Sequence, residues 1–248
     1  MIATELVDAL IAAHGGRARW HLVDSIEASL SSGGLAFALK GQPLALRWLH
    51  AVVRPHAREV VLYGYAQPEW RGVWTPDVVR LVDARGETIA QRESPRACFA
   101  RVGRQLRWDR LDMLYFAGYA LWNYLSFPFL LESSGVTAIE KPVDGAPGTR
   151  LLEAWFDESV PTHCRVQRFH IDASLHLLRH DYTADVIGRL ATAANFCRAA
   201  EEVDGIRFYT RRQVVPRFGD GLILPFPTLV WIELDSLRVR FVGGGRPA

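Results

Sequence analysis

The chain has 248 residues, of which 49% are hydrophobic and 23% are charged, and its formal net charge is only +2. This composition excludes a disordered chain, and the near-balance of charge along most of the length gives no basic face for nucleic acid. Three cysteines without a short Cys-x-x-Cys spacing indicate neither a disulfide framework nor a zinc site.

An amphipathic helix is predicted for residues 1–16, because apolar residues recur at helical spacing and Gly15 and Gly16 follow as a C-terminal stop. Its apolar stripe consists of Ile2, Leu6, Leu10 and Ala13. The segment contains Glu5 and Asp8 and has no basic region before them, so it does not resemble a signal peptide. We therefore expect a cytoplasmic protein.

Residues 20–92 are predicted to form a meander of short antiparallel strands. Segments rich in β-branched and aromatic residues alternate there with turn sequences such as SSGG, GQP and ARGE. The expected strands lie within residues 21–30, 35–41, 45–53, 59–65 and 78–92. The segment GYAQPEWRGVWTPD, with its two prolines, is expected to be a loop that joins two strands.

A helical insert is predicted for residues 95–125. Within and beyond it, the stretch MLYFAGYALWNYLSFPFLL carries no charge over nineteen residues. A membrane-spanning helix is not expected, because Asp109 and Asp112 precede the stretch, Asn123 lies inside it and Pro128 breaks it. We expect instead a helix that begins near Asp109 and ends before Pro128, and that is buried because it is apolar nearly all round.

Strands resume in residues 149–242, at a spacing like that of the first set. The expected strands lie within residues 149–156, 165–172, 175–186, 205–218 and 228–241. This order predicts an α+β protein of one domain, residues 1–248, with one large antiparallel sheet and a helical insert. A sheet of this size curls, and its concave face needs a cover, which the apolar helix provides.

Three motifs resemble proteins of one known fold group. AAHGGRARWHLVDSIEASL resembles the opening of the lipoprotein carriers, and DYTADVIG followed by VDGIRFYTRRQVV resembles their later paired strands. The chain is therefore similar to the LolA/LolB-like fold group, which implies a curved antiparallel half-barrel closed by helices over an apolar cavity. Lipoprotein shuttling is not implied, because no signal peptide is expected.

Strand alternation predicts which side chains face this cavity, on the premise that the apolar face of each strand points inward. The inward residues of interest in the later strands are His163, Arg165, Gln167, Leu178, His180, Tyr182, Phe208 and Arg212. The helix adds one stripe with three- and four-residue spacing, made of Asp112, Tyr115, Tyr119, Trp122 and Asn123. Asp112 is expected to pair with Arg212 or Arg165.

Two interpretations of these inward polar groups stay open. They form a satisfied network that fixes the helix to the sheet, or part of the network is free to hold a ligand. In the second case His180 is a candidate general acid or base, and Tyr182, on the same face, is a candidate donor to an oxyanion. Asp181 points to the other face and is not expected to act with them.

No nucleotide-binding loop, serine-nucleophile elbow or HExxH sequence is present, so no cofactor is expected. No metal is expected either, since His176 and His180 on a strand lie about 13 Å apart. We predict binding of an apolar small molecule, lipid-, isoprenoid- or polyketide-like. The alternatives are a cofactor-independent isomerase or cyclase in the same cavity and an interior filled by its own side chains. Oligomeric state has no signal in the sequence.

Overall fold

A computed structural model describes residues 4–142, 148–219 and 221–244. Within these ranges the main feature is an antiparallel sheet of 14 strands that is not closed into a barrel. Its first strands are β1 (Val23–Gly33), β2 (Leu49–Arg54), β3 (Glu59–Tyr63), β4 (Arg71–Trp74), β5 (Val78–Val82) and β6 (Thr88–Glu93). The later strands are β7 (Val136–Lys141), β8 (Arg150–Phe156), β9 (Val166–Ile171), β10 (Leu177–Thr183), β11 (Thr192–Val203), β12 (Ile206–Phe218), β13 (Leu222–Ile223) and β14 (Val230–Phe241).

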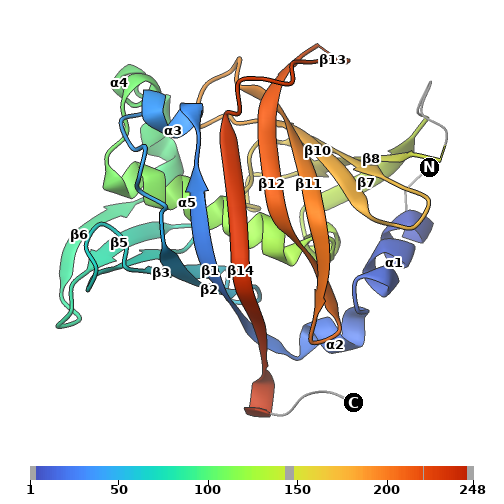
Figure 1. The fold of residues 1–248 in the computed structure, drawn as a ribbon, viewed down its shortest axis with the longest axis horizontal. Coiled ribbons are helices and arrows are strands. Elements are labelled where there is room, and N and C mark those ends of the chain that lie inside the picture. The colour runs from blue at the N-terminus through green and yellow to red at the C-terminus, as the bar shows by residue number, and fades with distance from the viewer. Residues whose placement is uncertain (1–3, 143–147, 220, 245–248) are drawn as a thin grey trace.

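The sheet consists of two meanders that are joined by the first and the last long strands. The spatial order is β6-β5-β4-β3-β2-β1-β14-β12-β11-β10-β9-β8-β7, and β13 pairs with β12 outside this path. Ile26 of β1 lies between Val53 of β2 and Val239 of β14. Because β1 pairs with β14, both halves of the chain share one curved sheet, as expected (Figure 1).

The helices are few and mostly short. They are α1 (Thr4–Ala13), α2 (Arg17–His21), α3 (Leu35–Leu39), α4 (Val102–Leu106) and α5 (Arg110–Ser126). Short 3₁₀ turns cover Pro95–Ala100, Phe129–Glu132 and Val242–Gly244. None of the helices in the described ranges has the length and hydropathy that crossing a membrane requires.

Helix α5 fills the concave side of the sheet, as predicted from its all-round apolar sequence (Figure 1). Asp109 caps its first turn through a capping box with Asp112, and the helix ends at Ser126, just before Pro128. All its residues after Arg110 are buried. A Cβ atom on Gly118 would collide with the ring of Trp74, so this glycine lets α5 lie directly on β4. The predicted half-barrel is confirmed.

Several elements differ from the sequence prediction, and α2 and β13 were not predicted either. Residues 35–41 were expected to be a strand, but Leu35–Leu39 form α3, because Leu and Ala have a high helix propensity. The expected loop at residues 64–77 contains the four-residue strand β4. Strands β7 and β11 were not predicted; β11 is rich in Ala and Glu, and its pairing with β10 and β12 outweighs that helical preference. Ile2 of the predicted first helix lies outside the described residues.

Candidate functional site

A small cavity lies between α5 and the middle of the sheet. Its walls are apolar side chains from β1, α3, α5 and β14, among them Leu30, Phe37, Ala120 and Ile232. Three hydroxyl-bearing side chains also line it: Ser32 of β1, Tyr124 of α5 and Tyr182 of β10. Its volume is about 20 Å³, which is room for one water molecule. The interior is therefore almost filled by its own side chains.

Strand register places a layer of buried polar groups beside this cavity. His180 of β10 lies opposite Asn195 of β11, and Cys197 of β11 lies opposite Arg212 of β12. Arg212 in turn lies opposite Ile232, a residue of the cavity wall. The exposed fraction is 3% for Arg212 and 0% for Asn195. The inward orientation that alternation predicts for His180, Tyr182 and Arg212 thus agrees with their burial.

Three tyrosines and a histidine form a hydrogen-bonded chain between α5 and the sheet. The Tyr119 hydroxyl lies 3.2 Å from His163 Nδ1, and the Tyr124 hydroxyl lies 2.8 Å from His163 Nε2. The Tyr124 and Tyr182 hydroxyls are 3.1 Å apart. The His163 ring stacks on the Tyr182 ring, with centroids 3.8 Å apart. A hydroxyl that both donates and accepts allows a proton to move along such a chain.

The tautomer of His180 follows from its neighbour Gln167. The amide nitrogen of Gln167 donates to the carbonyl oxygen of Cys164 at 3.0 Å, so its amide oxygen points to His180 Nε2, 2.6 Å away. An amide oxygen only accepts, so Nε2 carries the proton and Nδ1 is the unprotonated nitrogen. The ring stacks on Phe169 at 4.4 Å. His180 is held in place on two sides.

Burial keeps the cluster's histidines and tyrosines uncharged at neutral pH. Desolvation lowers the pKa of His163 and His180 well below its ordinary value, and the positive charge of Arg212 lowers it further. Desolvation also raises the pKa of the Tyr124 hydroxyl to about 12 and that of Tyr182 well above its ordinary value. The charge of this layer therefore comes from Arg212.

The contacts of Arg212 are unusual for a buried guanidinium. Its Nη1 donates to Cys197 Sγ at 2.9 Å, and its carbon Cζ lies 4.2 Å from the centre of the Tyr124 ring. Its Nε has no hydrogen-bond partner among the residues that the structure describes. Asn195 lies against the Tyr124 hydroxyl, yet neither polar atom of its side chain has a hydrogen bond of ordinary geometry. Buried polar groups are normally paired, so this corner has unused bonding capacity.

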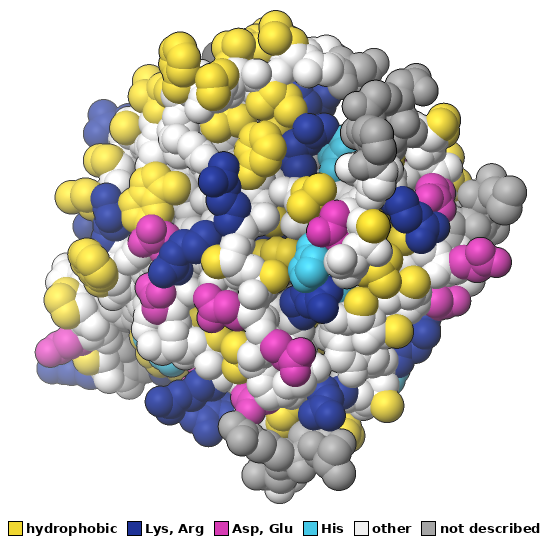
Figure 2. Space-filling view, turned by 45° about the vertical axis from the view of Figure 1, so that its right-hand side comes forward, with side chains coloured by type: hydrophobic (Ala, Val, Ile, Leu, Met, Phe, Trp, Pro, Cys, Tyr) yellow, Lys and Arg dark blue, Asp and Glu magenta, His cyan; other side chains and the backbone are white. Residues whose placement is uncertain are grey.

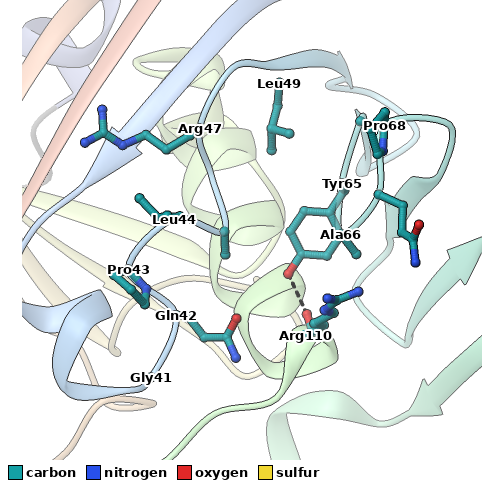
Figure 3. Close-up of a pocket in the computed structure, with 13 residues that line it drawn as sticks. Gly41, Gln42, Pro43, Leu44, Arg47, Leu49, Tyr65, Ala66, Pro68 and Arg110 are labelled. Atoms are coloured by element: carbon teal, nitrogen blue, oxygen red, sulfur yellow. Dashed lines mark hydrogen bonds between the residues drawn. The ribbon is translucent and has the colours of Figure 1, made fainter.

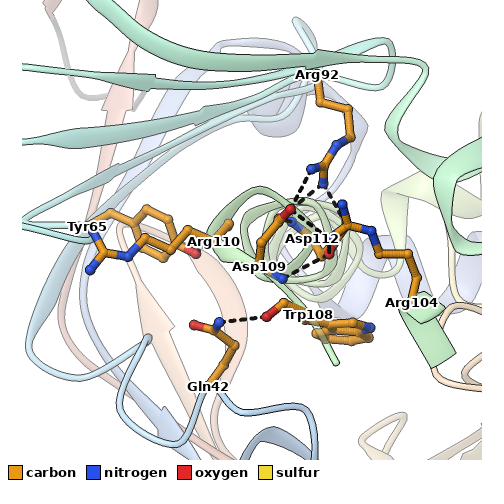
Figure 4. A network of polar contacts seen from close by, with 8 residues as sticks. All are labelled: Gln42, Tyr65, Arg92, Arg104, Trp108, Asp109, Arg110 and Asp112. Carbon is orange, nitrogen blue, oxygen red and sulfur yellow. Dashed lines mark hydrogen bonds and ion pairs between the residues drawn. The ribbon is translucent and has the colours of Figure 1, made fainter. Parts of the chain in front are cut away.

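The expected partner of Asp112 is wrong. Asp112 is fully buried and pairs with Arg92 and Arg104, not with Arg212 or Arg165 (Figure 4). Both arginines also bind Asp109, and the Asp112 carboxylate accepts the Asp109 N–H at 2.9 Å. This ion cluster closes the first turn of α5. Asp112 is therefore not the counter-charge of Arg212.

Two other predicted residues lie on the surface. The side chain of Arg165 is 73% exposed and lies 3.7 Å from Glu158, so it does not face the cavity. Leu178 is 41% exposed instead of inward, because a register irregularity between Leu177 and Arg179 breaks the alternation there. Arg165 and the buried Tyr115 instead help to line a surface cleft of about 520 Å³.

The remaining predicted residues are buried, but Trp122 and Asn123 form hydrogen bonds outside the polar layer beside the cavity. The Trp122 indole donates to the Pro55 carbonyl at 2.9 Å, toward the turn between β2 and β3. Asn123 donates to the carbonyls of Tyr119 and Pro161, both at 2.7 Å. Phe208 is buried on the same face of β12 as Arg212. Of the predicted site residues, the layer of buried polar groups beside the cavity therefore contains Tyr119, Gln167, His180, Tyr182 and Arg212.

Several residues of this polar layer were not predicted as site residues from the sequence. Tyr124 lies in the predicted helix but outside the stripe, and Asn195 and Cys197 lie in the unpredicted strand β11. His163 was seen as inward but was not assigned a role. The signal that was available is the alternation within residues 193–197, where Asn195 and Cys197 share a parity.

A larger pocket opens on the surface between the loops around Pro43 and Ala66 (Figure 3). Its volume is about 400 Å³, and inside it the Tyr65 hydroxyl donates to the Arg110 carbonyl at 2.6 Å. Its lining contains no His, Cys, Asp or Glu among the described residues. Across the described ranges, no group of three or more such side chains is placed to hold a metal ion. The interior layer, with its convergent donors, is the stronger candidate site.

Comparisons with known proteins found similar solved structures. One is a DUF1329 family protein from Desulfovibrio piger, with 16% identity and a TM-score of 0.44 over 96% of this chain and 92% of that chain. Another is a LolA superfamily protein from Nitrosomonas europaea, with 8% identity and a TM-score of 0.49 over 98% of this chain and 95% of that chain. No protein-family model matches the chain, and no curated protein matches it.

Proposed function

We propose that the protein binds an apolar small molecule between α5 and the concave face of the sheet. The observation that carries this proposal is that an apolar cavity lies beside buried polar groups, Asn195 and Arg212, whose hydrogen-bonding capacity is not fully used within the described residues. A mostly apolar site with a few convergent polar groups is typical of small-molecule binding. A satisfied structural core would not leave Asn195 and Arg212 with unused donors.

Ligand entry requires movement, because the cavity holds only about 20 Å³. Phe37 of α3 is part of the wall, and α3 is a five-residue helix between Gly34 and Gly41, both of which have positive φ. Leu35 and Leu39 on the same helix are exposed. Apolar side chains gather at the upper end of the molecule, where α3 and β13 lie (Figure 2). We place the entrance beside α3.

Filling the cavity tests the proposal. Ala120→Leu inserts a larger side chain into the wall, and we expect it to weaken the binding of a fluorescent apolar probe such as an anilinonaphthalene dye by about tenfold or more. Ala12→Leu, on the exposed side of α1, is the matched control and should bind as the unchanged protein does. Native mass spectrometry of the purified protein identifies any ligand that stays bound. Equal binding by both variants would place the ligand elsewhere.

A cofactor-independent isomerase or cyclase is the second candidate function. The observation that favours it is the hydrogen-bonded chain from Tyr119 through His163 and Tyr124 to Tyr182, beside the unprotonated Nδ1 of His180. Neutral imidazoles and tyrosine hydroxyls are suited to moving a proton within a dry cavity. Turnover would use the same cavity as binding.

A further inference from the structure

Buried charges in this protein are generally paired. Asp112 pairs with Arg92 and Arg104, and Asp181 is 2.8 Å from Arg179 Nε. Such pairing is the rule, because an isolated charge in a dry interior loses its hydration without compensation. In the part of the chain that the structure describes, Arg212 has no carboxylate within ion-pair distance although its exposed fraction is 3%.

The surroundings of Arg212 do not supply the missing negative charge. Cys197 is buried with its pKa raised, so its thiol is protonated, and the neighbouring tyrosine hydroxyls are neutral as well. His180 and His163 have lowered pKa values and contribute no charge. Among the described residues, Arg212 Nε has no hydrogen-bond partner, and the Asn195 amide beside the Tyr124 hydroxyl makes no hydrogen bond of ordinary geometry. These donors and this single positive charge suit a monoanion.

Arg212 lies directly behind the wall of the apolar cavity. Its strand neighbour Ile232 and its ring neighbour Tyr124 both line the cavity, so the guanidinium lies one side chain behind the wall. A turn of the Tyr124 ring would open the guanidinium to the cavity. A carboxylate there accepts two parallel hydrogen bonds from a guanidinium, the pairing for which arginine is best suited.

We infer that the ligand is an acidic amphiphile, with a carboxylate held by Arg212 and Asn195 and an apolar tail in the cavity. This inference rests on the proposed function, because it assumes that the cavity takes an apolar ligand. It adds the chemistry of the head group. The Tyr124 ring, which now covers the guanidinium, moves aside when the head group binds, and the Tyr124 and Tyr182 hydroxyls remain as further donors.

The test compares lauric acid with dodecanol, which has the same tail and no charge, by displacement of the fluorescent probe. We expect the acid to bind about ten- to hundredfold more tightly than the alcohol. Arg212→Met should lose this preference while it keeps its affinity for dodecanol. Its melting temperature should not fall, since the change removes a buried charge that has no counter-ion.

Arg47→Met is the matched control. Arg47 also lies over an aromatic ring, 4.4 Å from the centre of Trp231, and its Nε is also buried without a partner, but it lines the surface pocket of Figure 3. This variant should keep the preference for the acid. Loss of the preference in Arg47→Met would move the head group to the surface pocket and overturn the inference.

Other outcomes separate the inference from the proposed function. Equal affinity of the unchanged protein for lauric acid and dodecanol refutes the acidic head group and leaves the apolar site in place. Binding of neither molecule refutes both. If Arg212→Met does not fold, Arg212→Lys serves instead, and it should weaken the acid preference because an ammonium does not form the paired bonds. An unchanged preference in either variant refutes the role of Arg212.

Discussion

His180 and Arg212 lie in the same buried layer and respond differently to burial. An imidazole gives up its proton when it is desolvated, and His180 is neutral for this reason. A guanidinium does not lose its proton, and among the described residues no carboxylate lies within ion-pair distance of Arg212. The histidines therefore fit either a structural role or proton transfer, whereas Arg212 favours an anionic ligand.

The enzymatic alternative makes a prediction for His180 and Tyr182. If His180 is the general base, His180→Ala lowers turnover about 10²- to 10⁴-fold, and Tyr182→Phe lowers it less because it removes one hydroxyl. Activity is measured on a substrate found by a metabolite screen, with thermal melts beside it. His176→Ala is the control, since His176 lies on the surface side and pairs with Asp172.

The same two variants also test the alternative that His180 and Tyr182 have only a structural role. In that case His180→Ala unfolds the protein, because it leaves a cavity and an unpaired Gln167 oxygen. Tyr182→Phe then leaves turnover unchanged. That combination contradicts catalysis at this position.

At the scale of elements, α5 depends on its first turn. The buried Asp112 carboxylate accepts the Asp109 N–H and binds two arginines, so it joins the helix cap to an ion cluster (Figure 4). Asp112→Ala should lower the free energy of unfolding by about 3 kcal/mol or more, since two arginines lose a buried partner and the cap loses a bond. Urea denaturation measures this change.

The matched control is an exposed carboxylate. Asp235 lies 2.8 Å from Arg211 on the surface, and Asp235→Ala should cost less than about 1 kcal/mol, because water screens such a pair. Similar losses for Asp112→Ala and Asp235→Ala would show that the cluster at the start of α5 does not stabilise the fold.

At the scale of the whole molecule, buried neutral histidines make stability depend on pH. Burial lowers the pKa of His14 to about 4, and the pKa of His163 and His180 lies well below its ordinary value. The unfolded chain takes up protons at these histidines near pH 6.5 and the folded chain does not. The stability is therefore complete above about pH 6.5 and falls as the pH drops below it.

We expect a loss of about 2 kcal/mol per buried histidine between pH 7.5 and pH 5, measured by urea denaturation. His14→Gln should reduce the loss, because it removes one of the titrating groups. A free energy of unfolding that is constant over this pH range would contradict the neutral state of the buried histidines.

Local pattern was enough for several features of this protein. The limits of α5 follow from Asp109 as a cap and Pro128 as a stop, and its burial follows from a surface that is apolar all round. Strand alternation placed His180, Tyr182 and Arg212 on the concave face of the sheet, because successive side chains of a strand point to opposite faces. It failed at Leu178, where an irregular register adds one residue to the count.

Pairing between distant segments was decided by the tertiary structure. Nothing in the sequence of β1 names β14 as its partner, and nothing in Asp112 distinguishes Arg92 from Arg212. These choices depend on how the whole sheet curves and on which side chains the curve brings within a few ångströms. The sequence alone therefore determined the type, the limits and the inner face of most elements. Only the folded chain decided that Asp112 pairs with two arginines at the start of α5, and that Arg212 lies beside the cavity with no counter-charge among the described residues.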